Sequence, residues 1–157
     1  DKTKATPVNL HHCIDATLTI LRNQYKNNIK IVKKYDTELS LVICRAGQIN
    51  QVLMNLLANA VQAIEDKGEI IIQTSSEDNY ASIKIQDSGS GIPEDILNKI
   101  FDPFFTTKPI GKGTGLGLSI SHGIVRDHQG EIIVESQQGR GTTFTVKLPF
   151  SPEIQGA

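Results

Sequence analysis

The sequence contains few of the residues from which metal sites, redox centres and disulfide frameworks are built. It has no tryptophan, aromatic residues make up 5% of it, and only two of its 157 residues are cysteines. Cys13 and Cys44 form no C-x-x-C pair and have no histidine cluster at metal-ligand spacing, so the sequence gives little support to a zinc or redox site. Two buried thiols in a reducing compartment are the favoured interpretation.

Long apolar runs are also absent. No stretch approaches the ~18 apolar residues that span a bilayer, and the first residues do not form a signal peptide. This predicts a cytoplasmic domain that makes no direct membrane contact. Because the chain starts with Asp1 rather than methionine, we expect a piece of a longer protein, and any membrane anchor would lie outside it.

Neither sign of charge is in excess. The 16 Lys and Arg residues and the 17 Asp and Glu residues give a formal net charge of −1. A chain with this balance and with scattered basic residues is poorly suited to a phosphate backbone, so we expect no nucleic-acid partner. The length and the 38% content of hydrophobic residues suit one soluble domain with its own core.

Hydrophobic periodicity predicts a mixture of helices and strands. Helical spacing predicts helices over residues 8–28, 48–66 and 116–128, and a short helix with a proline at its start over residues 93–100. Alternating or β-branched runs predict strands over residues 29–36, 39–44, 69–75, 81–87, 131–135 and 142–149. A turn at residues 36–38 would join the first two strands, and the last four would form two hairpins.

These elements predict an α/β (α+β) two-layer sandwich. Antiparallel neighbours dominate and the helices are few, so the simplest packing is one mixed, mostly antiparallel sheet with helices on one face. Residues 1–7 are interpreted as a linker, residues 8–150 as the domain and residues 151–157 as a tail.

The helix over residues 48–66 carries a polar face opposite its apolar stripe. Asn55, Asn59, Gln62 and Asp66 follow one another at offsets of four, three and four, which places them along one side. A solvated face is the ordinary interpretation, but two asparagines one turn apart are unfavourable in a helix interior. Their amide oxygens are alternatively candidate ligands for Mg²⁺, which prefers oxygen donors.

A glycine-rich stretch covers residues 87–117 and holds six of the 13 glycines. It begins with Asp87 at a strand end, followed by two glycines that could form a turn or could let a flat ring approach the backbone. An ionised Asp only accepts hydrogen bonds, so it would select a base with an exocyclic amine. The alternate glycines from Gly111 to Gly117 lead into a helix, where free N–H groups suit a polyphosphate or form a flexible loop. The pattern is not a Walker P-loop.

Five segments in this order resemble the sequence boxes of sensor histidine kinases, which belong to the GHKL superfamily of ATP-binding proteins. They are NLLANA at 55–60, DSGSG at 87–91, FDPFFTTK at 101–108, GTGLGLS at 113–119 and GRGTTF at 139–144. They resemble the asparagine box, the first glycine box, the phenylalanine box and two later glycine boxes. Gln62 stands where many of these kinases have Lys, which is similar to nitrogen-regulatory sensor kinases and leaves Lys108, Lys112 and Lys67 as candidate cations at the phosphates.

The resemblance implies a GHKL fold that binds ATP and Mg²⁺. Asn59 would hold the metal, Asp87 would accept a hydrogen bond from the adenine amine, and Thr142 would share a water near the base. Residues 105–114 would form a mobile ATP lid. The nucleotide-binding residues implied are Asn59, Asp87, Gly89, Gly91, Ile92, Phe105, Thr106, Thr107, Lys108, Gly113, Thr114, Gly115, Leu116, Gly117, Leu118 and Thr142. Asn55, Asn59 and Lys108 would take part in catalysis.

The residue at position 55 bears on whether such a chain would hydrolyse ATP or transfer its phosphoryl group. In ATP-hydrolysing members of the superfamily a glutamate four residues before the metal asparagine activates water, whereas the Asn55 amide has no useful basicity. The resemblance therefore implies a protein-histidine kinase domain that donates the γ-phosphoryl group of ATP. A nucleotide-binding regulator without phosphotransfer and a hydrolysing ATPase are the alternatives.

The phosphoacceptor sequence of these kinases is missing. No histidine of the chain is followed by an acid and then a proline at the expected spacing, and His11 and His12 are expected to be ordinary surface or half-buried residues. The resemblance then implies that the acceptor histidine is on a separate dimerisation domain. A response regulator would be an indirect partner in two-component signalling.

Overall fold

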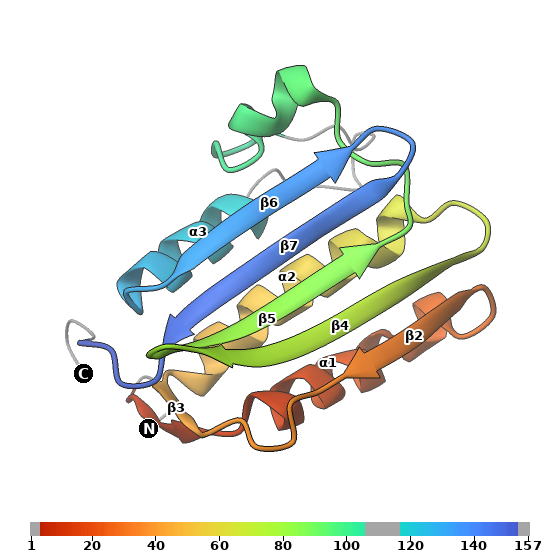
Figure 1. Ribbon diagram of the computed structural model, residues 1–157. Helices are drawn as coiled ribbons and strands as arrows, with labels where there is room; N and C mark the ends of the chain where they lie inside the picture. The colour runs from red at the N-terminus through yellow and green to blue at the C-terminus, as the bar shows by residue number, and fades with distance from the viewer. Residues whose placement is uncertain (1–3, 106–116, 154–157) are drawn as a thin grey trace.

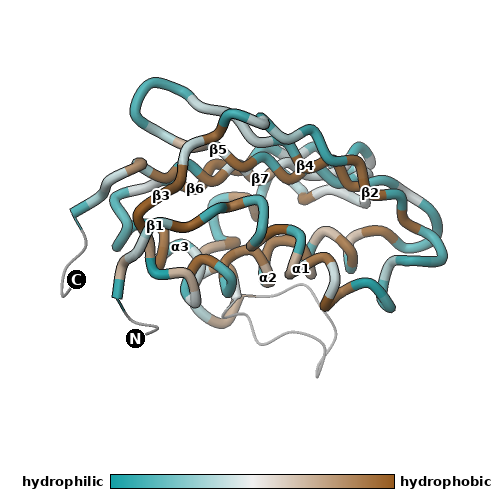
Figure 2. The backbone as a smooth tube through the Cα atoms, turned by 90° about the horizontal axis from the view of Figure 1, so that it is seen from below, coloured by the Kyte–Doolittle hydropathy of each residue, from teal (hydrophilic) through white to brown (hydrophobic). Residues whose placement is uncertain are grey.

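Five strands form one sheet, and the helices cover a single face of it (Figure 1). The computed structural model describes residues 4–105 and 117–153. In the edge-on view of Figure 2, α1, α2 and α3 lie together on one side of the strands. The predicted two-layer sandwich with a mixed, mostly antiparallel sheet is therefore confirmed.

The strand order of this sheet is β2-β4-β5-β7-β6. Its strands are β2 (Ile29–Lys34), β4 (Gly68–Glu77), β5 (Tyr80–Asp87), β6 (Glu131–Gln137) and β7 (Gly141–Pro149). β2 runs parallel to β4, and the other neighbours are antiparallel, which confirms both predicted hairpins. Alternation places Ile72, Ile85 and Phe144 side by side on the buried face, where they form part of the core under the helices.

A second, two-stranded sheet holds the start of the domain. β1 (Thr6–Val8) pairs antiparallel with β3 (Val42–Cys44), and the Ile43 N–H donates to the Phe150 carbonyl at 2.8 Å. The predicted linker over residues 1–7 is thus wrong at its end, because Thr6 and Pro7 belong to β1. The two strands predicted at 29–36 and 39–44 exist in shorter form in different sheets, because β2 is paired with β4 and β3 with β1.

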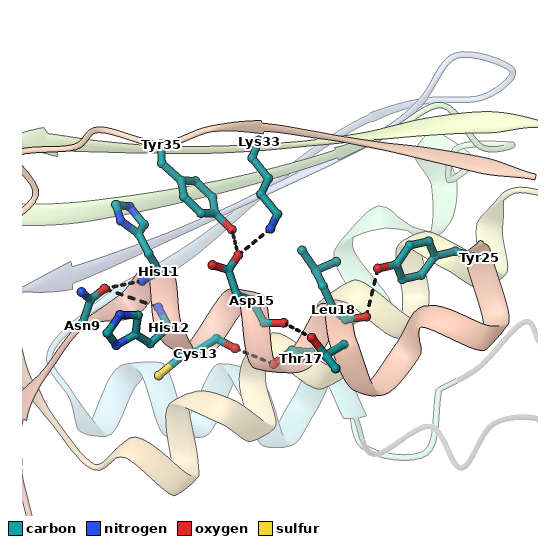
Figure 3. Close-up of polar contacts among 11 residues, drawn as sticks. Asn9, His11, His12, Cys13, Asp15, Thr17, Leu18, Tyr25, Lys33 and Tyr35 are labelled. Carbon is teal, nitrogen blue, oxygen red and sulfur yellow. Dashed lines mark hydrogen bonds and ion pairs between the residues drawn. The ribbon is translucent and has the colours of Figure 1, made fainter.

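Helix α1 (Leu10–Tyr25) is shorter than the predicted helix over residues 8–28. Asn9 is its N-cap, and Asn9 Oδ1 accepts hydrogen bonds from the N–H groups of His11 at 2.9 Å and His12 at 3.4 Å (Figure 3). A capping side chain must itself leave the helical conformation, so the helix cannot include Val8. Apolar periodicity alone could not distinguish this cap from the residues around it.

A polar cluster fastens α1 to the edge strand β2. Asp15 Oδ1 accepts a hydrogen bond from Tyr35 Oη at 2.9 Å and pairs with Lys33 Nζ at 2.8 Å (Figure 3). The His11 ring stacks on the Tyr35 ring with centroids 4.2 Å apart, and its Nε2 lies 2.7 Å from Thr74 Oγ1. The half-buried His11 and exposed His12 are confirmed as ordinary residues of the fold.

Helix α2 (Ala46–Ala63) crosses the middle of the sheet and buries its apolar stripe against it. Its buried residues are Ile49, Val52, Leu53, Leu56, Leu57, Ala60 and Val61, as its periodicity predicted. The prediction that the helix continues to Asp66 is wrong. Ile64 has extended backbone angles and is itself buried, so the chain turns toward β4 before Asp66 can join the polar face.

A 3₁₀ helix over Glu94–Lys99 and helix α3 (Gly117–Asp127) complete the described elements. The predicted helix over residues 116–128 begins at the edge of the described chain, and its C-terminal end is one residue shorter than expected. His128 follows α3 and is fully buried, with Nδ1 2.8 Å from the Ile124 carbonyl oxygen. Its Nε2 accepts the Arg45 N–H at 3.1 Å, which joins the end of α3 to the start of α2.

Candidate nucleotide site

A buried carboxylate lies where strand β5 ends. Asp87 is 5% exposed and is the cross-strand partner of Thr142 in β7. Its Oδ1 accepts hydrogen bonds from the N–H groups of Gly89 at 2.8 Å and Thr142 at 3.3 Å. Burial raises the pKa of Asp87 above its ordinary value, and the two N–H donors counteract this rise by stabilising the ionised form. The carboxylate is thus held by the backbone in one orientation.

The loop after Asp87 is packed closely between two other segments. A Cβ added at Gly89 would lie 2.7 Å from the Ala63 carbonyl carbon at the end of α2. Gly91 has a φ of +76°, and a Cβ there would lie 2.8 Å from the Gln137 carbonyl carbon. The sequence suggested that these glycines let a flat ring reach the backbone, but protein backbone fills the space beside each of them. They are required for the loop to pack against α2 and β6.

Asn55 connects α2 to the first turn of α3. Its Nδ2 donates to the Gly117 carbonyl oxygen at 3.0 Å and to the Ser121 hydroxyl at 3.1 Å. An amide nitrogen has two protons, so these two bonds account for both. The Ser121 side chain is fully buried, and the pair of bonds therefore fixes how α3 lies against α2.

Asn59 lies between the two ends of the glycine-rich stretch. Asn55, Asn59 and Ala63 are spaced four residues apart and share one face of α2. The first of these contacts Gly117 and the last accepts the Ser90 N–H at 3.2 Å. The half-buried Asn59 is thus one helical turn from each contact, whereas Gln62 is exposed. An oxygen ligand at Asn59 would therefore lie on the helix face that contacts both Ser90 and Gly117.

Thr142 meets a serine that sequence reasoning missed. The Thr142 hydroxyl lies 2.7 Å from the Ser136 hydroxyl, which also accepts the Ile92 N–H at 2.7 Å. Ser136 is the cross-strand partner of Thr142 and faces the same side of the sheet. The alternation in β6 gave a signal for this orientation, but a serine in a strand does not by itself indicate a site.

The structure brings together part of the predicted set. Asp87, Gly89 and Thr142 share hydrogen bonds, Ile92 is bonded to the same cluster through Ser136, and Asn55 contacts Gly117. Phe105 and Leu118 are half-buried against the core. The predicted residues Thr106, Thr107, Lys108, Gly113, Thr114, Gly115 and Leu116 lie outside the described residues, as does most of the predicted lid.

Residues 4–105 and 117–153 contain no group of three or more His, Cys, Asp or Glu side chains that could hold a metal ion. If Asn59 held Mg²⁺ by its amide oxygen, phosphates and waters could take further positions of the ion, as they commonly do. In the same part of the chain, no helix combines the length and apolar character that a membrane crossing needs.

Comparison with known proteins decides the family. The family described as histidine kinase-, DNA gyrase B-, and HSP90-like ATPase matches residues 44–152, well over half of the chain. The chain belongs to this ATPase family. The match contains both sides of the site, from α2 to the end of β7, and membership implies that ATP is the nucleotide used.

Similar proteins are mainly sensor kinases. The chain is 43% identical over 148 residues to the signal transduction histidine-protein kinase AtoS of Escherichia coli. This alignment covers 93% of the chain and 24% of AtoS. It is 35% identical to the sensory histidine kinase/phosphatase NtrB of Rhizobium leguminosarum, over 94% of the chain and 42% of NtrB. The chain thus spans less than half of these ATPase-family relatives.

Solved structures agree with this assignment. The catalytic domain of the histidine kinase ThkA superposes with a TM-score of 0.85 and 35% identity, over 95% of this chain and 97% of that domain. A second ThkA structure, in complex with the response regulator TrrA, matches with a TM-score of 0.80 and 33% identity, over 94% of this chain and 42% of that one. The fold is that of histidine kinase catalytic domains, as the sequence boxes predicted.

Proposed function

We propose that this chain is the Mg²⁺–ATP-binding catalytic domain of a sensor histidine kinase and donates the γ-phosphoryl group to a histidine of a separate dimerisation domain. The observation that carries the proposal is the placement of Asp87 and Asn59. A buried carboxylate stands at one end of the glycine-rich stretch, and an amide-bearing helix face touches both ends of it. Sensor kinases among its relatives support the same activity.

Each end of the proposed site has its own task. Asp87, oriented by two backbone N–H groups, would accept a hydrogen bond from the adenine amine. Asn59 would supply an amide oxygen to Mg²⁺, and the metal would neutralise phosphate charge. Lys108 and the glycines up to Gly117 would enclose the phosphates. Phosphoryl transfer depends mainly on such positioning and charge neutralisation, so the chain needs no strong base of its own.

Asn55 favours transfer over hydrolysis. A residue that activates water needs a free basic atom beside the phosphate. Both amide protons of Asn55 are instead bonded to α3, and an amide has no useful basicity. The site would therefore protect ATP until an acceptor histidine reaches it.

The acceptor domain would dock beside the phosphate end. The Phe101 ring lies 5.1 Å from the His122 ring, so Phe101 lies against α3. Phe104 next to this contact is 72% exposed, and Ile120 of α3 is 38% exposed. We propose these two side chains as contacts for the acceptor domain. We also propose that a response regulator later accepts the phosphoryl group from the histidine. The domain is proposed to lie in the cytoplasm.

A two-stage experiment tests the proposal. Calorimetry should show ATP binding that requires Mg²⁺ in the unmodified chain and loses the Mg²⁺ dependence in Asn59→Ala. The chain is then mixed with γ-labelled ATP and a separately prepared helical phosphoacceptor domain, and acid-labile label on a histidine is expected. ATP binding without transfer would favour a regulatory nucleotide-binding module, and steady release of phosphate without an acceptor would favour an ATPase.

A further inference from the structure

The Ser136 hydroxyl connects three segments of the site. It accepts the Ile92 N–H at 2.7 Å, donates to the Gly141 carbonyl oxygen at 3.1 Å, and lies 2.7 Å from Thr142 Oγ1. These partners belong to the loop after β5 and to the start of β7. Ser136 is itself half-buried near the end of β6. One hydroxyl group thus joins the loop after β5 to the start of β7, where Thr142 is the cross-strand partner of Asp87.

Counting protons fixes the direction of the Thr142 hydroxyl. A serine hydroxyl has one proton to donate and two lone pairs that accept. The Ser136 proton is used on the Gly141 oxygen, and one lone pair is used on the Ile92 N–H. The contact with Thr142 can then be a hydrogen bond only if Thr142 donates to Ser136. Only this arrangement makes all three contacts favourable.

The consequence is that Thr142 offers lone pairs alone to anything else beside it. The neighbouring Asp87 carboxylate also only accepts hydrogen bonds when ionised. Two side chains from adjacent strands, both buried to 5% exposure, therefore present acceptors to the same region. Such a region favours a ligand edge with N–H donors, or a water that such an edge orients, over an edge with a carbonyl oxygen.

We propose that Ser136 is a specificity-determining positioning residue, which orients the Thr142 hydroxyl so that the site selects a 6-amino purine over a 6-oxo purine. This inference rests on the proposed function, because it takes the region beside Asp87 and Thr142 to hold the base. Ser136 acts through Thr142 and is not itself a ligand of the nucleotide. Without the Ser136 hydroxyl, the Thr142 proton can turn toward the base and donate to a carbonyl.

The test measures the ratio of the affinities for ATP and for inosine triphosphate, which differ at the 6-position. Calorimetry with Mg²⁺ present should give a ratio in Ser136→Ala that is about threefold to tenfold smaller than in the unmodified chain, the factor that one net hydrogen bond provides. Ser136→Cys keeps nearly the same volume with a much weaker hydrogen-bonding group, and it should shift the ratio in the same direction if the alanine variant does not fold. Ser136→Thr retains the hydroxyl and should retain the ratio.

Two controls separate orientation from general damage. In a Thr142→Val background, Ser136→Ala should change the ratio no further, because the proton that it redirects is gone. Ser88→Ala deletes another hydroxyl next to this loop, which accepts the Glu69 N–H at 2.9 Å, and it should leave the ratio unchanged. The proposal would be overturned if Ser136→Ala weakened the binding of ATP and of inosine triphosphate by the same factor. It would also be overturned if Ser136→Ala changed the ratio as much in the Thr142→Val background as in the unmodified chain.

The outcome for the unmodified chain distinguishes the two proposals. If it binds neither triphosphate, the proposed function fails before any variant is compared. If it prefers ATP and the Ser136 variants keep that preference, the proposed function stands and the role of Ser136 is wrong.

Discussion

At the scale of single residues, Asp87 shows how a buried carboxylate can remain able to accept a hydrogen bond from a ligand. Removing a carboxylate from water is unfavourable, and this raises the pKa of Asp87. The N–H groups of Gly89 and Thr142 replace part of the lost hydration. The residue is therefore constrained by the fold at one oxygen while it remains suited to accept a hydrogen bond from a ligand.

Asp87→Asn tests this function with little change in shape. The asparagine oxygen can still accept the Gly89 N–H, so the fold should be retained. The loss of a hydrogen bond to a charged group should weaken ATP binding by about 1.5–3 kcal/mol and reduce the preference for adenine over guanine nucleotides. Calorimetry with both nucleotides measures this. Unchanged selectivity would contradict the assignment of Asp87 to the base.

The raised pKa of Asp87 also predicts a pH dependence. The folded state holds the proton more tightly than the unfolded state, so the contribution of Asp87 to the free energy of unfolding falls as pH rises from the ordinary pKa of 3.8 through the raised value. ATP binding, which needs the ionised form, should weaken as pH falls through the same window. Binding curves of Asp87→Asn over the same pH range supply the control, since they lack this titration and keep that of the nucleotide.

At the level of elements, Asn55 decides how α3 lies against α2. Asn55→Ala removes both bonds to α3 and leaves the buried Ser121 hydroxyl with one partner fewer. We expect the free energy of unfolding to fall by about 1–3 kcal/mol, as measured by urea denaturation. Asn50→Ala is the matched control, because Asn50 is exposed on the same helix and alanine has the higher helix propensity. Equal effects of the two substitutions would contradict the connecting role of Asn55.

The contact between α2 and the loop after β5 depends on the absence of a side chain at Gly89. Gly89→Ala would push a methyl group against the Ala63 carbonyl and should lower the free energy of unfolding by about 1–3 kcal/mol. Gly47→Ala is the control, since nothing lies within 4 Å of a Cβ at that helical position. It should raise the free energy of unfolding by roughly 0.5–1 kcal/mol. Thermal unfolding of both variants measures the difference.

On the scale of the whole molecule, the two thiols report on global opening. Cys13 in α1 and Cys44 in β3 are buried, and burial together with the neighbouring Cys13 raises the pKa of Cys44 to about 12. The thiolate is the reactive form, so alkylation at pH 8 should be slow and should proceed at similar rates at both sites. Saturating Mg²⁺–ATP should slow it further, because a ligand of the folded state stabilises that state. Mass spectrometry of alkylated peptides measures each rate, and rapid labelling of one cysteine alone would indicate local opening instead.

Sequence patterns predicted the main architecture because its signals are local. Apolar residues at helical spacing identified α2, and alternation identified the hairpins β4–β5 and β6–β7. The start of α1 and the separation of β2 from β3 were not predictable in this way. The first depends on a capping bond from Asn9, and the second on which strands, distant in the chain, compete for the same partners.

The residue types in the stretch from Asp87 to Gly117 and on the polar face of α2 were enough to indicate a nucleotide site, because the required chemistry restricts those positions to a few side chains. The relation between the two segments was decided by tertiary structure alone. Only folding brings Asn55 to Gly117 and Gly89 to Ala63, and only the pairing of β6 with β7 places Ser136 beside Thr142. Hydrogen bonds between residues distant in the chain leave no periodic signal in the sequence, and these bonds fix the direction in which each functional group points.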